Sequence, residues 1–259
     1  MSPRPVAAAV DFGIDDLEPA DSATEHNADY LSVIGPELTL LSQQTTTNPH
    51  TALLKDGYYV AFDTAHMWND MSGRSSLIAV HTEQDFGAGT FRVEFMSHAL
   101  IGLAEQWLVD RGADPDAFTR DSVITAADEE TTRLEEMLRG SGGRFTAHDD
   151  YTHAAEPYDV WVIATDTLAQ GSEMPVRVFH EQRQVDTDTY TLREGHFPSI
   201  EEALEWTKDP NAPLPSSGRR PNARAAAART TTARTGTQPA AEVSRNTGPS
   251  SGTGRKPSR

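Results

Sequence analysis

The sequence predicts an α+β fold of largely antiparallel sheet covered by about three helices, followed by a disordered C-terminal tail. Three observations lead to this prediction. Short runs of alternating apolar and polar residues are bounded by turn residues, other stretches have helical periodicity with capping residues, and this order of elements partly recurs.

The predicted strands fall into two groups along the chain. In the first group, residues 52–64 predict a hairpin that turns at Asp56-Gly57, and residues 75–83 and 89–96 predict two further strands. The second group of predicted strands comprises residues 143–153, 158–167, 175–184 and 188–194.

Three helices are predicted between and after these strands. Residues 97–112 have an apolar stripe, with Ser97 as the expected cap and Gly112 as the expected end. Residues 125–140 have acids in the first turn and Arg139 in the last, as the helix dipole favours. Residues 199–209 begin with a capping box formed by Ser199 and Glu202.

The two groups of elements resemble each other. His81 and His180 lie 99 residues apart, and so do Trp107 and Trp206. This spacing predicts two related strand-rich halves, at residues 51–112 and 143–209, each with a helix whose tryptophan fills the core. The alternative is that capped helices after strands simply look alike.

Composition divides the chain into three segments. Residues 1–28 are acidic and predict a flexible leader, residues 29–211 predict the folded body, and residues 212–259, rich in Ser, Thr, Gly, Pro, Ala and Arg, predict disorder. Residues 214–259 contain nine Lys or Arg and one acid, a net charge of +8, whereas the remainder has 13 bases and 38 acids, a net charge of −25.

Residue usage narrows the chemistry and the setting. The 259 residues include no cysteine, which excludes disulfides, thiolate metal sites and cysteine nucleophiles. No apolar run approaches the ~20 residues of a membrane helix, so a cytoplasmic protein without membrane association is predicted. Only three of the 22 bases are Lys, a usage typical of a high-GC bacterium.

The segment from His148 to His153 raises the question of a metal site. On a regular strand, His148 and Asp150 share one face, where they could hold a divalent ion with a third ligand from His81, His180 or Glu83. The favoured interpretation is a polar strand end at the surface, because no second ligand pair with this spacing occurs. No metal and no cofactor is therefore predicted.

Other motifs are incomplete. The run that starts at His180 has Gln184 where a zinc protease needs its second histidine, and the pair Asp186 and Asp188 is a common spacing. No phosphate-binding loop and no nucleophile elbow is present. The polar loop from His66 to Arg74 fits an ordinary strand connection better than a binding rim.

The basic tail carries the clearest functional signal. Small residues separate its arginines, which suits contact with phosphates without reading of bases. Pairing with the chain's own acidic body is an equal alternative. The candidate contact residues for nucleic acid or for this tethering are Arg219, Arg220, Arg224, Arg229 and Arg234.

Three functions remain open at this point. The first is a non-catalytic acidic interaction or accessory protein that engages a basic surface of a protein partner, with the tail as a tether. The second is a metal-dependent hydrolase or transferase that uses His and Asp on strands, and the third is a nucleic-acid-associated protein that binds weakly and non-specifically through its tail. Whether the protein is an enzyme, its substrate or partner, and its oligomeric state are not determined by these patterns.

Overall fold

The computed structural model describes residues 10–48, 50–65, 75–120, 125–153, 158–184 and 187–216. These residues form two mostly antiparallel sheets and four α-helices, which confirms the predicted α+β class. Residues 217–259, which make up most of the predicted disordered tail and include its five candidate arginines, lie outside the described residues. None of the described helices is long and apolar enough to cross a membrane.

The first half contains a six-stranded sheet in the order β1-β5-β4-β3-β2-β6. Its centre is an antiparallel meander of β2 (Leu38–Thr47), β3 (Leu54–Asp63), β4 (Leu77–Asp85) and β5 (Thr90–His98). Two short strands complete the edges: β1 (Glu18–Pro19) pairs in parallel with β5, and β6 (Thr119–Arg120) pairs with β2.

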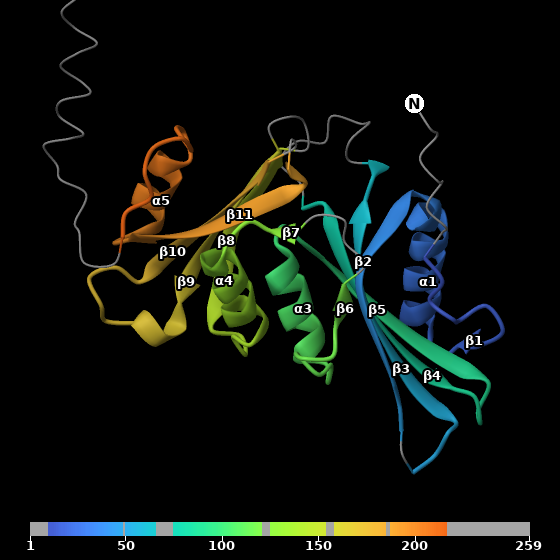
Figure 1. The fold of residues 1–259 in the computed structure, drawn as a ribbon. Coiled ribbons are helices and arrows are strands. Elements are labelled where there is room, and N and C mark those ends of the chain that lie inside the picture. Colours follow the sequence, from blue (N-terminus) through green and yellow to red (C-terminus); the bar gives the residue numbers. More distant parts are fainter. Residues whose placement is uncertain are drawn as a thin grey trace, which may run out of the picture. The chain divides into compact units, whose positions relative to one another are not determined.

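Two helices cover opposite faces of this sheet (Figure 1). Helix α1 (Ser22–Ile34) is capped by Asp21 and leads through a 3-10 turn (Gly35–Glu37) into β2. It packs over a core that includes Leu31, Tyr59 and Val80. Helix α3 (Ile101–Val109) packs on the other face, where Leu108 meets Tyr58 and Val60. Alternate residues of β3 therefore enter different cores, as a strand requires.

The second half repeats this plan with a five-stranded sheet in the order β7-β11-β10-β9-β8. Strand β7 (Thr125–Ala126) pairs in parallel with β11 (Thr189–Phe197), and β8 (Phe145–His153), β9 (Asp159–Asp166) and β10 (Val176–Gln184) complete the meander. A 3-10 turn (Thr167–Ala169) follows β9. Helix α4 (Glu129–Arg139) covers one face and α5 (Ile200–Trp206) covers the other.

The correspondence between the halves extends to details of register. Asp21 and Asp128 cap α1 and α4 in the same way, each accepting a hydrogen bond from the backbone N–H three residues later. The first strand of each meander carries an irregularity at the same place, between Leu40 and Ser42 in β2 and between Ala147 and Asp149 in β8. Each half therefore has the order short strand, helix, four-stranded meander, helix.

A buried polar network joins the halves where α3 packs against α4. A Cβ on Gly102 would lie 2.9 Å from the Cβ of Leu138, so glycine permits this close approach. Beside it, the fully buried Glu105 carboxylate accepts hydrogen bonds from Ser42, Arg120 and Arg139. Burial alone would raise the pKa of Glu105, but the hydrogen bonds and charges of the two arginines outweigh it and hold the pKa below its usual value.

Arg120 also links this carboxylate to a second one. Its Nη1 donates to the Oε2 of Glu135 on α4 over 2.7 Å, and the other oxygen of Glu135 accepts from the hydroxyl of Tyr190 on β11. Each buried charge thus has oppositely charged or polar partners, which is the condition under which buried ions are tolerated.

The structure corrects both predicted boundaries of the folded body. Residues 10–28 are not a flexible leader, because Phe12 is buried in the core and β1 and α1 lie in this range. The body also extends beyond residue 211. The N–H of His196 donates to the carbonyl of Pro215, and Leu214 packs beside Gly195.

Two local predictions in the first half are also wrong. Asp56-Gly57 is not a turn but lies within β3, where a Cβ on Gly57 would come within 2.6 Å of the Thr82 hydroxyl. Ser97 does not cap α3, because it belongs to β5 and the helix begins at Ile101 without a side-chain cap. In contrast, the capping box at Ser199 is confirmed in its Ser199 half, since this hydroxyl accepts from the N–H of Glu202.

Candidate functional site

The pair His148 and Asp150 does not form a ligand set in the structure. The irregularity in β8 falls at His148, so the regular alternation on which the pairing depended is broken there. The Nε2 of His148 lies 2.7 Å from the Thr165 hydroxyl, and Asp150 accepts a hydrogen bond from the Ser75 hydroxyl. Neither residue belongs to a group of three or more potential ligands among the described residues.

The structure instead brings together Asp56, His81 and Glu83, whose potential ligand atoms all lie within 4.8 Å of one another. Two strands position them. His81 and Glu83 are two residues apart on β4 and therefore share a face, and Asp56 on β3 is the direct cross-strand partner of Glu83. The sequence patterns indicated His81 and Glu83 only as possible third ligands for a site at His148 and Asp150, and they predicted a turn at Asp56.

His81 is the buried member of this group. It is only 6% exposed, and its ring stacks on Tyr58, its cross-strand partner, with the ring centroids 4.9 Å apart. Its Nε2 is sealed from solvent and has no hydrogen-bond partner among the described residues. The nearest carboxylate oxygen, Oδ1 of Asp56, lies 3.8 Å away, which is beyond hydrogen-bond distance.

Burial controls the electrostatics of His81. It lowers the pKa of the imidazole, while the neighbouring Glu83, Asp56 and Glu94 carboxylates act in the opposite direction without overcoming it. The ring is therefore neutral at pH 7, which is the form in which a histidine nitrogen accepts a proton or binds a metal ion.

The second half contains the same histidine and aspartate in the same register. His180 on β10 and Asp159 on β9 occupy the positions of His81 and Asp56, as the register of each meander shows. There the Asp159 carboxylate bonds directly to the His180 Nε2. The position of Glu83 is taken by Gln182, the cross-strand partner of Asp159. The two halves therefore differ in whether the histidine nitrogen is already bonded and in the presence of a second carboxylate.

A second feature of the first half is an acidic surface along its N-terminal segment and α1. Residues 10–29 contain no Lys or Arg. Seven carboxylates in this range are exposed, and none forms an ion pair with another described residue. The acidic surface, as the term is used below, consists of Asp11, Asp15, Asp16, Glu18, Asp21, Glu25 and Asp29.

The acids of the second half are in a different situation. Asp128 pairs with Arg193 at the start of α4, Glu130 pairs with Arg133, and Asp166 pairs with both Arg144 and Arg177. The hydrogen bonds from Arg193 and Thr131 hold the pKa of Asp128 far below its usual value. Much of the acidity of the second half is thus paired locally, whereas the acidic surface forms no ion pair with described residues and only the charge of Arg92 acts on one of its members, Asp21.

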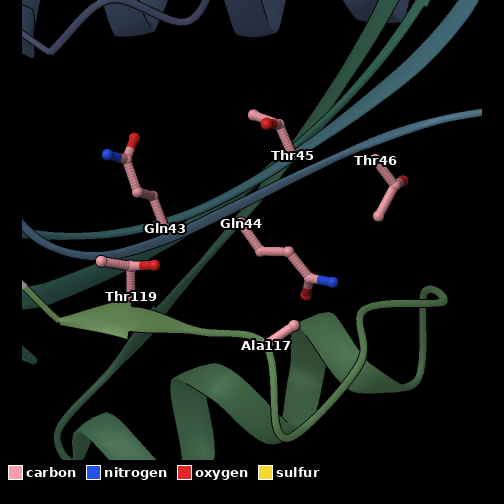
Figure 2. A pocket seen from close by; sticks show the side chains of 6 residues that line it. All are labelled: Gln43, Gln44, Thr45, Thr46, Ala117 and Thr119. Atoms are coloured by element: carbon pink, nitrogen blue, oxygen red, sulfur yellow. The ribbon is translucent and has the colours of Figure 1, made fainter.

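A polar hollow of about 500 Å³ lies beside the edge of β2 (Figure 2). Figure 2 shows Gln44 pointing toward Ala117, with Gln43 and Thr45 on the other side of the strand. The Gln44 side-chain oxygen already accepts from the N–H of Asp114. The lining supplies amides and hydroxyls but no ionisable side chain, so this hollow offers no group for acid–base chemistry. The lining residues are Gln43, Gln44, Thr45, Thr46, Ala117 and Thr119.

No protein-family model, no curated protein and no solved structure matches this chain.

Proposed function

We propose that this chain is a non-catalytic interaction protein whose acidic surface engages a basic surface of a protein partner. The observation that carries the proposal is the group of seven exposed carboxylates in residues 10–29 without any Lys or Arg in the same segment. Such a one-signed surface steers an oppositely charged partner during diffusional encounter and fixes its orientation.

Apolar side chains next to these carboxylates favour a protein partner. On α1, Tyr30 is 44% exposed and Val33 is 76% exposed, and Tyr30 stacks on Phe95 of β5. Interfaces commonly combine a centre of aromatic, Met and aliphatic residues with a charged rim, and this part of the first half offers both.

The basic tail is assigned the role of a tether in this proposal. Its net charge of +8 would let it pair with acidic groups of the partner or with the chain's own body. Because the tail is covalently attached, its effective concentration near the acidic surface is high, and an external basic partner must compete with it.

A binding experiment with charge variants tests the proposal. The probe is a synthetic arginine-rich peptide, titrated into the full chain at several salt concentrations. Neutralising Asp15, Asp16 and Glu18 to Asn, Asn and Gln should slow association and weaken binding at low salt, and the difference from the unmodified chain should shrink as salt rises.

The matched control removes the same number of charges elsewhere. Glu129→Gln, Glu136→Gln and Asp149→Asn are exposed positions of the second half that form no ion pair with described residues. We expect this triple variant to bind the peptide nearly as well as the unmodified chain. An equal loss in both variants would mean that the net charge, rather than the acidic surface, governs binding, and the proposal would then fail.

The same design separates the proposal from binding of nucleic acid through the tail. A peptide of residues 214–259 should bind a single-stranded oligonucleotide more tightly than the full chain does, because the acidic body competes in the full chain. With about five phosphates contacted, the slope of log affinity against log salt should be about −3.5 on single strands. Tighter binding by the full chain would place a nucleic-acid site on the folded body and favour that function instead.

A further inference from the structure

We propose that Asp56, His81 and Glu83 form a binding site for one divalent transition-metal ion, with Zn²⁺ as the representative ion. The three residues supply one imidazole nitrogen and two carboxylates from a single face of β3 and β4. This inference is independent of the acidic surface, which lies on α1 and the segment before it.

The distances between the ligand atoms fit a common ion. Ligand atoms at about 2.0 to 2.2 Å from a zinc ion are at most about 4.4 Å apart, and usually closer. The His81 Nε2 and the Asp56 Oδ1 are 3.8 Å apart, and the largest separation in the group stays within 4.8 Å. The remaining gap is at most a few tenths of an ångström, and the exposed Glu83 side chain is free of ion pairs with described residues, so it can turn to close it.

The unpartnered nitrogen of His81 is the second observation that points to a ligand. A buried polar atom without a partner costs about 1 to 3 kcal/mol, so natural proteins rarely leave one. Here the Nε2 has no described hydrogen-bond partner, lies 3.8 Å from the Asp56 Oδ1, and belongs to a residue that is grouped with two carboxylates. A divalent cation would bond to the nitrogen and neutralise both carboxylates at the same time.

Comparison with the second half supports this reading. Asp159 bonds directly to the Nε2 of His180, and the position of the second carboxylate holds Gln182. That histidine is satisfied without an ion. In the first half Asp56 lies beyond hydrogen-bond distance of His81, and Glu83 adds a second carboxylate. The first half therefore offers three potential ligands that are not bonded to one another, whereas the histidine and aspartate of the second half bond to each other.

The ligand types predict which ions bind. Imidazole suits Zn²⁺, Co²⁺ and Ni²⁺, whereas Mg²⁺ and Ca²⁺ prefer oxygen ligands alone. The ion would approach from the side of the carboxylates, because the Asp56 side chain is 40% exposed and Glu83 is exposed while the imidazole is buried. Water would complete the coordination on that side.

The test measures binding of Zn²⁺ and of Co²⁺ to the full chain produced without an affinity tag. We expect one equivalent of Zn²⁺ by calorimetry, visible absorption bands on addition of Co²⁺, and no comparable binding of Mg²⁺. Glu83→Gln, which gives the first half the residue type of the second, should weaken Zn²⁺ binding more than about tenfold, since even the loss of an outer-shell partner of a metal ligand costs 10- to 100-fold.

Three further measurements make the result decisive. Glu83 is exposed, so Glu83→Gln should unfold at the same urea concentration as the unmodified chain, and a loss of binding cannot then be assigned to misfolding. His81→Gln should also lose the ion, whereas the matched control His148→Gln, at an exposed histidine outside the group, should retain it. In NMR spectra of ¹⁵N-labelled protein, Zn²⁺ should shift the ring signals of His81 and leave those of His180 unchanged. Absence of stoichiometric binding, full binding by Glu83→Gln, or loss of binding by His148→Gln would each overturn the proposal.

Discussion

Glu105→Gln should destabilise the fold more than any exposed charge substitution, because it removes the negative charge from the centre of the buried network between α3 and α4. Glu105 is fully buried, and its two oxygens accept four hydrogen bonds, two of them from Arg120. The amide of glutamine would turn an NH₂ group toward the arginines. Arg120 would then keep only Glu135 as a carboxylate partner, and Arg139 would lose its carboxylate partner.

The size of this effect follows from the cost of leaving a buried charge without its counter-ion. Removing one partner of a buried pair costs about 3 to 5 kcal/mol. With a dependence of about 2 to 3 kcal/mol per molar urea, the unfolding midpoint should fall by about 1 to 2.5 M. The loss should also depend on pH. The folded-state pKa of Glu105 is lowered, so its contribution is present above the unfolded value near 4.5 and disappears as the pH falls below it.

The control for this prediction is Glu130→Gln on α4. Glu130 pairs with Arg133 one turn away, and both side chains are about half exposed, at 50% and 56%. Such a pair contributes roughly 0 to 1 kcal/mol, so its removal should barely move the midpoint. Equal midpoints for Glu105→Gln and Glu130→Gln would refute the argument that the buried network holds the two halves together.

Three further predictions concern single positions. Burial, with a smaller contribution from Arg111, lowers the pKa of His98 to about 4, so the protein should lose up to about 3 kcal/mol of stability as the pH falls from 6.5 to 4. His98→Phe introduces the residue that the second half has at Phe197. This variant should flatten the dependence of stability on pH, as measured by urea titrations at each pH. Trp206→Ala should lower the free energy of unfolding by about 3 to 5 kcal/mol in calorimetry, because the indole is buried and its Nε1 donates to the carbonyl of Ala212. In a variant that keeps Trp206 as its only tryptophan, a native emission maximum typical of exposed indole would contradict this. A chain that ends at residue 216 should melt within a few degrees of the 259-residue chain. A chain that ends at residue 211 should melt lower, because it lacks Leu214 and the Pro215 carbonyl. Equal melting temperatures of the two shortened chains would show that residues 212–216 contribute nothing to stability.

The sequence by itself determined the elements with strong local signals. Alternation between apolar and polar residues identified strands such as β4 and β10, and the residues Ser199 and Gly140 marked the start of α5 and the end of α4 as observed. The constant spacing of His81 and His180 and of Trp107 and Trp206 indicated two related halves, and the register of the meanders shows the same correspondence. The tryptophans differ in environment, since Trp206 is buried, whereas Trp107 is partly exposed under the Arg111 guanidinium. Charge usage along the chain also separated the basic tail from the acidic remainder.

Only the tertiary structure decided the features that depend on distant partners. Strand β2 was not predicted, because its short apolar start is followed by Gln and Thr. Ser42 and Gln44 are nevertheless buried, since Glu105 and the backbone of Asp114 satisfy them. Helix α1 was hidden by its acidic composition, since its stability comes from packing a few apolar residues on the sheet.

The candidate metal ligands were hidden for the same kind of reason. Asp56-Gly57 is a strong turn signal in isolation, and it becomes strand only because Gly57 allows β4 to approach closely. Once Asp56 is in β3, its register with Glu83 places both carboxylates beside His81, whereas the irregularity at His148 interrupts the alternation that would have put His148 and Asp150 on one face. Side-chain alternation is a local property, but cross-strand register and bulges are set by the whole sheet, so a ligand set that spans two strands is decided only when the sheet forms.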